Sequence, residues 1–346
     1  MTRLREGIPR RRTWLILAVV LWLAAVAAAT IGPVALPPNE TLVAIGRAIV
    51  NTPEETRADR VVRVRLPRVA LSAVVGAALA TSGAALQGLF KNPMADPYLL
   101  GVSAGGALGA TLAIALGFGL TAAGQAPVPL FAFGGALAAA WAVYLLGRAG
   151  GRVHTDTLLL AGVALSALLS AVMSLLLVLS AREDVVHAVY FWTLGGFYRA
   201  DWVRVGVALP YSLLGMIIAW TYARDLNAML MGEETAVHLG VDVERAKTVL
   251  LVGAALSSAA AVSVSGIIGF VGLVAPHVVR LLQGPDHRAM IPSCALVGAL
   301  FLVVCDTLAR TAFDPIEMPV GVLTAFTGVP FFLYLLRRSR RMSAHG

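Results

Sequence analysis

The chain has 346 residues, of which 58% are hydrophobic and 13% are charged. Soluble domains carry about a quarter charged residues, so this composition excludes an ordinary soluble protein and predicts a polytopic membrane protein. The formal net charge is +8, but most of it comes from arginines beside apolar blocks. Such arginines are typical of membrane topology signals, and they do not indicate a nucleic-acid partner.

Apolar blocks near the length of a membrane span follow one another along the chain. One helical span needs about 20 apolar residues, and the alternating strands of about ten residues that build a membrane barrel are missing from the pattern. The predicted fold class is therefore all-α, with about ten transmembrane helices. The predicted spans are residues 14–33, 69–90, 98–119, 127–147, 157–180, 203–222, 247–265, 267–283, 290–309 and 318–336.

Arginines cluster before the first predicted span and after the last one. Because cytoplasmic flanks carry the excess of basic residues, both termini are predicted to be cytoplasmic. We expect a single transmembrane domain over 1–346, with a tail at 1–12, a ten-helix membrane part at 13–336 and a second tail at 337–346. Arg11 and Arg12 faintly resemble a twin-arginine export signal, but a multi-span chain more often keeps its first apolar segment as an anchor.

The predicted spans hold almost no titratable groups. Ion-coupled transporters usually carry such groups in their spans to bind the coupling ion, so their scarcity weakens an ion-coupled mechanism. A phosphate-binding loop needs glycines followed by Lys-Ser or Lys-Thr, and neither Lys91 nor Lys247 has this context. If the protein performs active transport, ATP is hydrolysed on another chain.

Neither a metal site nor a bound cofactor is predicted for this chain. Cys294 and Cys305 both lie in the ninth predicted span and are interpreted as small packing residues. The six histidines show no paired ligand spacing.

Several arginines lie between the first two spans, on the predicted outer face, against the usual bias of basic residues toward the cytoplasm. They are Arg57, Arg60, Arg63, Arg65 and Arg68. Two interpretations stay open: docking of an acidic partner by charge complementarity, or anchoring of a helix end in the lipid head groups. Arg310, just after the ninth span, falls on the same predicted face and favours docking slightly.

The second and third spans are rich in small residues at helical spacing, which predicts close helix packing. Between them, Asn92-Pro93-Met94 and Asp96-Pro97 predict a short inner turn that stops the helix. A second inner loop contains Thr155 and Asp156, either of which is placed to cap the fifth helix. Each loop is interpreted either as a simple connection or as part of a gate.

Two later segments interrupt the pattern of spans. Residues 225–245 form the longest predicted inner loop, with a helical pattern punctuated by Gly232 and Gly240, and predict a docking surface for a cytoplasmic partner. Residues 265–272 place three glycines in a helix-forming region, which predicts a broken helix that lines a pathway or is tightly packed. The string VGAAL occurs at 75–79 and 252–256, a weak sign of an inverted repeat.

Taken together, these stretches resemble the iron-siderophore, haem and cobalamin uptake permeases, the FecCD and BtuC-type subunits of type II ABC importers. The matching stretches run in order from about Arg65 to Arg337. They are RLPR, GAALATSGAALQGLFKNPMADPYLLGVSAG, LLLAGVALS, FWTLGGF, MGEETAVHLGV, GFVGLVAPHVVRLL with GPDHR, DTLAR, and MPVGVLTAFTGVPFF.

The resemblance implies roles for particular residues. Arg65, Arg68 and Arg310 match outer arginines that pair with acidic residues of a substrate-binding protein. Asn92 and Met94, with Thr155 and Asp156, match an inner gate, although Asp156 stands where a relative can carry a small hydroxyl residue. Residues that match the short ATPase-coupling helices are Gly232, Glu233, Glu234, His238, Leu239 and Gly240.

The resemblance also implies ten helices per subunit and a pathway between two permease subunits, here expected as a homodimer. The expected function is import of a metal chelate (ferric siderophore, cobalamin or haem) across the inner, cytoplasmic membrane. Two ABC ATPases would supply the energy and a periplasmic or lipid-anchored binding protein would deliver the cargo. The alternatives are an ion-coupled secondary transporter or exporter, and a membrane scaffold that transports nothing.

Overall fold

The computed structural model describes residues 10–50, 52–118 and 127–343. The elements in chain order are α1 (Arg10–Thr30), α2 (Pro38–Val50), α3 (Arg57–Leu89), η1 (Pro97–Leu100), α4 (Val102–Ala115), α5 (Pro127–Gly147), β1 (Arg148–Ala149), β2 (Arg152–Val153), α6 (Thr155–Ser180), α7 (Glu183–Leu194), α8 (Trp202–Thr221), α9 (Ala223–Leu230), α10 (Glu233–His238), α11 (Val243–Ser265), α12 (Val271–Gln283), α13 (His287–Ala309) and α14 (Val320–Ser343).

The predicted all-α fold of an integral membrane protein is confirmed. Within the described residues, seven helices are long and apolar enough to cross a membrane: α1, α3, α5, α6, α8, α11 and α13. Three shorter apolar helices, α4, α12 and the first part of α14, correspond to the remaining predicted spans. The count of ten is therefore approximate, because α4 and α12 have only 14 and 13 residues.

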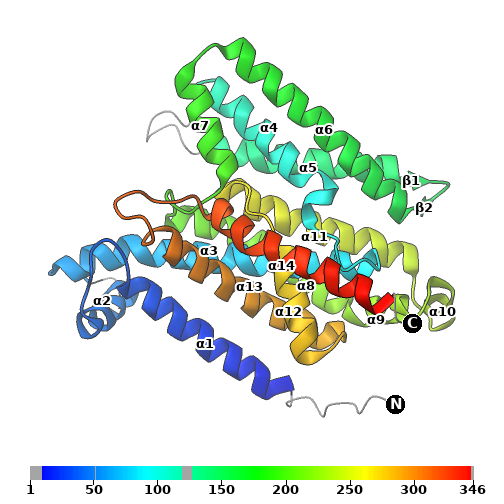
Figure 1. Cartoon of the computed structure of the whole chain (residues 1–346), viewed down its shortest axis with the longest axis horizontal. Coiled ribbons are helices and arrows are strands. Elements are labelled where there is room, and N and C mark those ends of the chain that lie inside the picture. The colour runs from blue at the N-terminus through cyan, green and yellow to red at the C-terminus, as the bar shows by residue number, and fades with distance from the viewer. Residues whose placement is uncertain (1–9, 51, 119–126, 344–346) are drawn as a thin grey trace.

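Helix α3 lies at the centre of the bundle. It runs for 33 residues and is buried along most of its length against α8, α11, α12 and α13. A capping box fixes its start, since the Thr56 side chain accepts from the Asp59 N–H while the Asp59 carboxylate accepts from the Thr56 N–H. Figure 1 shows α4 to α7 along one side of α3 and α11, and α1 and α2 along the other.

Glycines allow the backbones of the central helices to touch. A Cβ built on Gly76 would lie 2.1 Å from the carbonyl oxygen of Gly298 in α13, and one on Gly83 would lie 2.0 Å from the carbonyl oxygen of Gly272 in α12. The α4–α5 pair is built in the same way through Gly105 and Gly135. The predicted small-residue packing therefore joins α3 to α12 and α13, and α4 to α5.

The predicted helix break between α11 and α12 is present, over residues 266–270. Its backbone polar groups need partners from protein at membrane depth, and Tyr98 of η1 supplies two. The Tyr98 hydroxyl donates to the carbonyl oxygen of Ile268 at 2.5 Å and accepts the Ile268 N–H at 2.9 Å. A single side chain thus ties the break to the turn that follows α3.

The two ends of the bundle carry different elements (Figure 1). One end, which we call the terminal end, holds the start of α1 and the end of α14. It also holds α9, α10 and the β1–β2 hairpin. At the opposite end, which we call the α2 end, lie α2 and the loop that leads into α14. The terminal end corresponds to the face predicted to be cytoplasmic.

Substitution of Gly298 by alanine should destabilise the protein, because its Cβ would meet the Gly76 carbonyl oxygen at 2.3 Å and the backbone must move. We expect a loss of about 1–3 kcal/mol of unfolding free energy, as for other overpacked cores. Thermal unfolding of the purified protein in detergent measures it.

Gly134→Ala in α5 is the matched control, because a Cβ at Gly134 meets nothing within 4 Å. This control should be neutral or slightly stabilising, since alanine favours a helix by about 1 kcal/mol over glycine. Equal melting temperatures for the Gly298→Ala and Gly134→Ala variants would contradict the close approach of α3 and α13.

Candidate functional site

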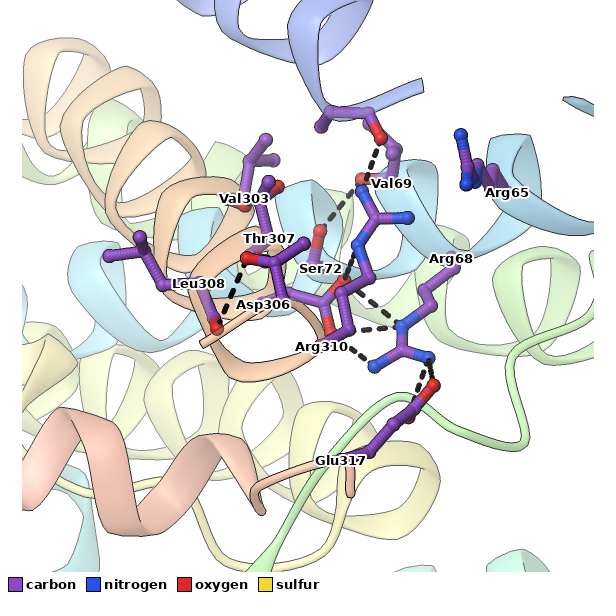
Figure 2. Close-up of polar contacts among 12 residues, drawn as sticks. Arg65, Arg68, Val69, Ser72, Val303, Asp306, Thr307, Leu308, Arg310 and Glu317 are labelled. Carbon is purple, nitrogen blue, oxygen red and sulfur yellow. Dashed lines mark hydrogen bonds and ion pairs between the residues drawn. The ribbon is translucent and has the colours of Figure 1, made fainter. Parts of the chain in front are cut away.

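A cluster of two arginines and two carboxylates lies at the α2 end (Figure 2). Arg68 of α3 places its Nε 3.0 Å from both carboxylate oxygens of Asp306 in α13. The same guanidinium reaches Glu317, with Nη1 2.9 Å from Oε2. Arg310 joins from the other side, with its Nε 3.9 Å from Asp306. Asp306 is thus shared by two arginines, and Glu317 is the exposed member of the cluster.

Arg65 and Arg310 both hold the end of α1. Arg65 donates to the carbonyl oxygens of Ala29 at 2.9 Å, Thr30 at 2.8 Å and Val34 at 2.6 Å. Arg310 donates to the carbonyl oxygen of Ala28. The last carbonyls of a helix have no partner within the helix, and basic side chains near a helix C-terminus satisfy them and favour its dipole. These two arginines therefore fasten α1 to α3 and α13.

This placement buries two of the three arginines to which the resemblance assigns docking. Arg65 and Arg310 are only 6% and 3% exposed. Both donate to carbonyl oxygens at the end of α1, and Arg310 also lies 3.9 Å from Asp306. The Arg68 side chain is 13% exposed and reaches the surface beside Glu317. Arg57 and Arg60, about two to three turns before Arg68 on α3, are exposed.

Next to this cluster the surface is hollowed by two neighbouring cavities. The first, of about 420 Å³, is lined by Arg68, Glu317 and residues 195–199. The second, of about 590 Å³, is lined by the end of α7, the break between α11 and α12, and one face of α14. Its lining contains no charged side chain, and includes Ile267, Phe270 and Phe326. The predicted broken helix therefore does line a cavity.

The first predicted gate segment is a tight turn after α3. The Asn92 side chain accepts the Met94 N–H at 2.9 Å, and the Asp96 side chain accepts the Tyr98 N–H at 2.9 Å. Burial raises the pKa of the Asp96 carboxyl to about 6, against the opposing effect of the Tyr98 N–H. The turn leads directly into η1 and so to Tyr98.

The second predicted gate segment opens α6. The helix begins at Thr155 with His154 as its N-cap residue, and no side chain caps it. The prediction that Thr155 or Asp156 caps the helix is wrong, because both already lie in its first turn. A Cβ on Gly162, two turns further on, would lie 1.7 Å from the Leu99 carbonyl oxygen. The two predicted gate segments are thus joined through the contact of η1 with α6.

The segment predicted for coupling forms two short helices separated by Gly232, with φ +125°, and ended by Gly240, with φ +85°. Ala236 is its buried anchor in α10, whereas Glu233, Glu234, His238 and Leu239 are exposed. Asn227 fastens α9 to the start of α13, because it donates to Asp286 at 2.7 Å and accepts the His287 N–H at 3.0 Å. The pair presents an exposed surface on a rigid base.

Sequence reasoning missed Glu317 and Tyr98. Glu317 precedes the last predicted span and is one of the few acidic residues in the last part of the chain, which is the signal that could have paired it with Arg68. Tyr98 stands among apolar residues, and nothing in its spacing indicates that it reaches a segment 170 positions away.

The sequence profile of the FecCD transport family matches residues 16–338. The cobalamin import system permease protein BtuC of Halobacterium salinarum is 51% identical over 275 residues, covering 79% of this chain and 72% of that protein. The hemin transport system permease protein HmuU of Yersinia pestis is 44% identical, over 80% of this chain and 83% of its own.

A solved structure agrees with the fold. It is described as an inward-facing conformation of a metal-chelate type ABC transporter, with a TM-score of 0.80 and 32% identity over 95% of this chain and 99% of that one. Members of the matched family are transport permease subunits, and ATP is hydrolysed on a separate chain in these systems. With the family model matched over residues 16–338, this chain belongs to the FecCD transport family.

Proposed function

We propose that this chain is the permease subunit of an ATP-driven importer that moves a metal chelate into the cytoplasm. The cargo is a ferric siderophore, cobalamin or haem, handed over by a substrate-binding protein. The observation that carries the proposal is the uncharged cavity of about 590 Å³ on the broken helix and α14. A lining without strong binding groups releases a bulky cargo readily, and the similar cobalamin and hemin permeases support this class of cargo.

A second permease subunit, in a homodimer, would complete the pathway. The cavity is open on one side, where Phe326 and Val329 of α14 are exposed. Helix α6 is also almost wholly exposed, with 6% of its most apolar window buried. A second copy facing these helices would enclose the cavity, while membrane lipid would cover the other apolar faces.

The α9–α10 surface of each permease subunit would bind one ATPase subunit, so the homodimer would bind two. The exposed side chains of this surface mix apolar Met231, Val237 and Leu239 with Glu233 and Glu234. Such a mixed surface on a rigid base suits a partner that must stay bound while it moves. In this arrangement the protein lies in the inner membrane, and its terminal end faces the cytoplasm.

ATP hydrolysis by the partner chain should be required for import. Proteoliposomes that contain the permease, its ATPases and its binding protein should take up radiolabelled cyanocobalamin, hemin or a ferric hydroxamate when ATP is enclosed with the ATPase domains. A hydrolysis-deficient ATPase variant should abolish uptake, whereas an ionophore that collapses ion gradients should not change it. Uptake that survives the ATPase variant and is lost with the ionophore would instead indicate an ion-coupled secondary transporter.

We propose that the binding protein docks at the α2 end through Arg68 and the exposed arginines near it. Arg65 and Arg310 support this surface from below, because their guanidinium groups are occupied by α1 and Asp306. Arg68 is the member of the three that reaches the surface, and Glu317 occupies part of its donor fork.

Glu317→Gln should therefore strengthen docking of an acidic binding protein. Removing this carboxylate frees the outer side of the Arg68 guanidinium, so we expect affinity to rise about 3–10-fold at low salt and the gain to shrink near 0.5 M salt, where surface charges are screened. The measurement is the dissociation constant of the binding protein on nanodiscs that hold the transporter.

Glu55→Gln is the matched control, because Glu55 also lies at the α2 end but pairs with Arg47. Both variants change the net charge equally. An equal gain in the two variants would show that overall charge, not Arg68, sets the affinity.

A further inference from the structure

Lys247 forms a buried polar junction at the terminal end that none of the roles above uses. It lies near the start of α11, is 4% exposed, and is one of only two lysines in the chain. Its Nζ lies 2.9 Å from Glu233 Oε2, 3.3 Å from Glu244 Oε1 and 3.4 Å from the Val153 carbonyl oxygen. An ammonium group has three donors, and each has an acceptor here.

Two of these contacts act on the same backbone residue. Glu244 accepts the Val153 N–H at 2.7 Å while Lys247 donates to the Val153 carbonyl oxygen. Both backbone groups of Val153 are thus held by α11. Val153 ends β2, whose hairpin is closed by pairing with Arg148 and by the His154 N–H donating to Gly147. A displacement of Val153 is therefore expected to move the whole hairpin.

The third contact reaches the surface proposed for the ATPases. Glu233 is the first residue of α10, and its side chain is 46% exposed, so it lies at the edge of that surface. On the other side of the junction, α6 begins at Thr155, two residues after Val153. The chain of contacts runs from Glu233 through Lys247 to Val153 and on to Thr155 and Asp156.

We propose that Lys247 is a positioning residue that transmits movement of α10 to the start of α6 and so couples ATP hydrolysis to the gate. The proposal rests on the proposed function. Leaving a buried cation without one of its partners is costly, so Lys247 does not readily release Glu233 or Val153 separately. Displacement of α10 by an ATPase is then carried to the hairpin.

The test uses the complete transporter in proteoliposomes and measures cargo uptake and ATP hydrolysis together. Lys247→Met keeps a long unbranched side chain and removes all three contacts. Uptake per ATP hydrolysed should fall about tenfold, within the range typical of coupling between sites, while the ATPases still copurify and hydrolyse ATP. Arg11→Met is the control, because Arg11 is an exposed cation at the start of α1, at the same end of the bundle, and its uptake per ATP should match wild type.

A double substitution separates transmission from simple anchoring or from lost contact with the ATPase. Glu233→Met removes the α10 side of the junction and, being partly exposed, is tolerated even if Lys247→Met folds poorly. If the two residues act in one link, the double variant should be no worse than the more impaired single variant. Effects that multiply would overturn the proposal, as would an unchanged uptake per ATP in either single variant.

Hydrogen exchange gives an independent readout in the same samples. In the wild type, ATP binding to the assembled complex should change exchange both at residues 230–241 and at 148–156. In Lys247→Met the change should stay at 230–241 and be lost at 148–156. A change that persists at 148–156 would overturn the inference. Wild-type vesicles that fail to import with ATP would overturn the proposed function itself, whereas normal coupling in Lys247→Met overturns only the role of Lys247.

Discussion

The structure depends on the direct contact of helix backbones around α3. In a membrane the hydrophobic effect does not drive helices together, because lipid is as apolar as they are, and close packing must do so. Gly76 against Gly298 and Gly83 against Gly272 bring α3 within backbone contact of α13 and α12. This approach places Arg68 beside Asp306 at one end of α3. At the other end it brings Gln87 to the Gly272 carbonyl oxygen and to Arg280. The polar clusters at the two ends are consequences of the same packing.

At three places where a helix begins, ends or breaks, protein side chains satisfy the free backbone groups. The break at 266–270 has Tyr98, the end of α1 has Arg65 and Arg310, and the start of α13 has Asn227. Unpaired backbone groups at membrane depth cost several kcal/mol each. These side chains lie where helices begin, end or break, whereas the lining of the cavity between α7 and α14 has no charged side chain.

Periodicity and composition predicted the elements well, and burial far less well. Apolar length predicted each main helix, glycine spacing predicted the close packing, and Gly232 and Gly240 marked the ends of α10. These features are local in sequence. The burial of Arg65 was not predictable in this way, because its acceptors lie at the end of α1 and just after it, 31 to 36 positions earlier. Lys247 likewise depends on Val153, 94 positions away. Packing decides which distant segment a polar side chain contacts. The spacing of residues along the sequence does not predict such contacts.

The charge balance of the cluster at the α2 end restricts which amino-acid substitutions this surface can accept during evolution. Arg68, Arg310, Asp306 and Glu317 sum to zero charge, and Asp306 is shared between both cations. Loss of Asp306 or Arg310, the two buried members, leaves another charge uncompensated, at a cost of about 3–5 kcal/mol for a buried pair. Substitutions at Asp306 and Arg310, the buried members, are therefore tolerated in compensated pairs rather than one at a time. Arg57 and Arg60, which have no part in this balance, are free to vary singly, so the outer surface can adapt to a new partner without disturbing the helices beneath it.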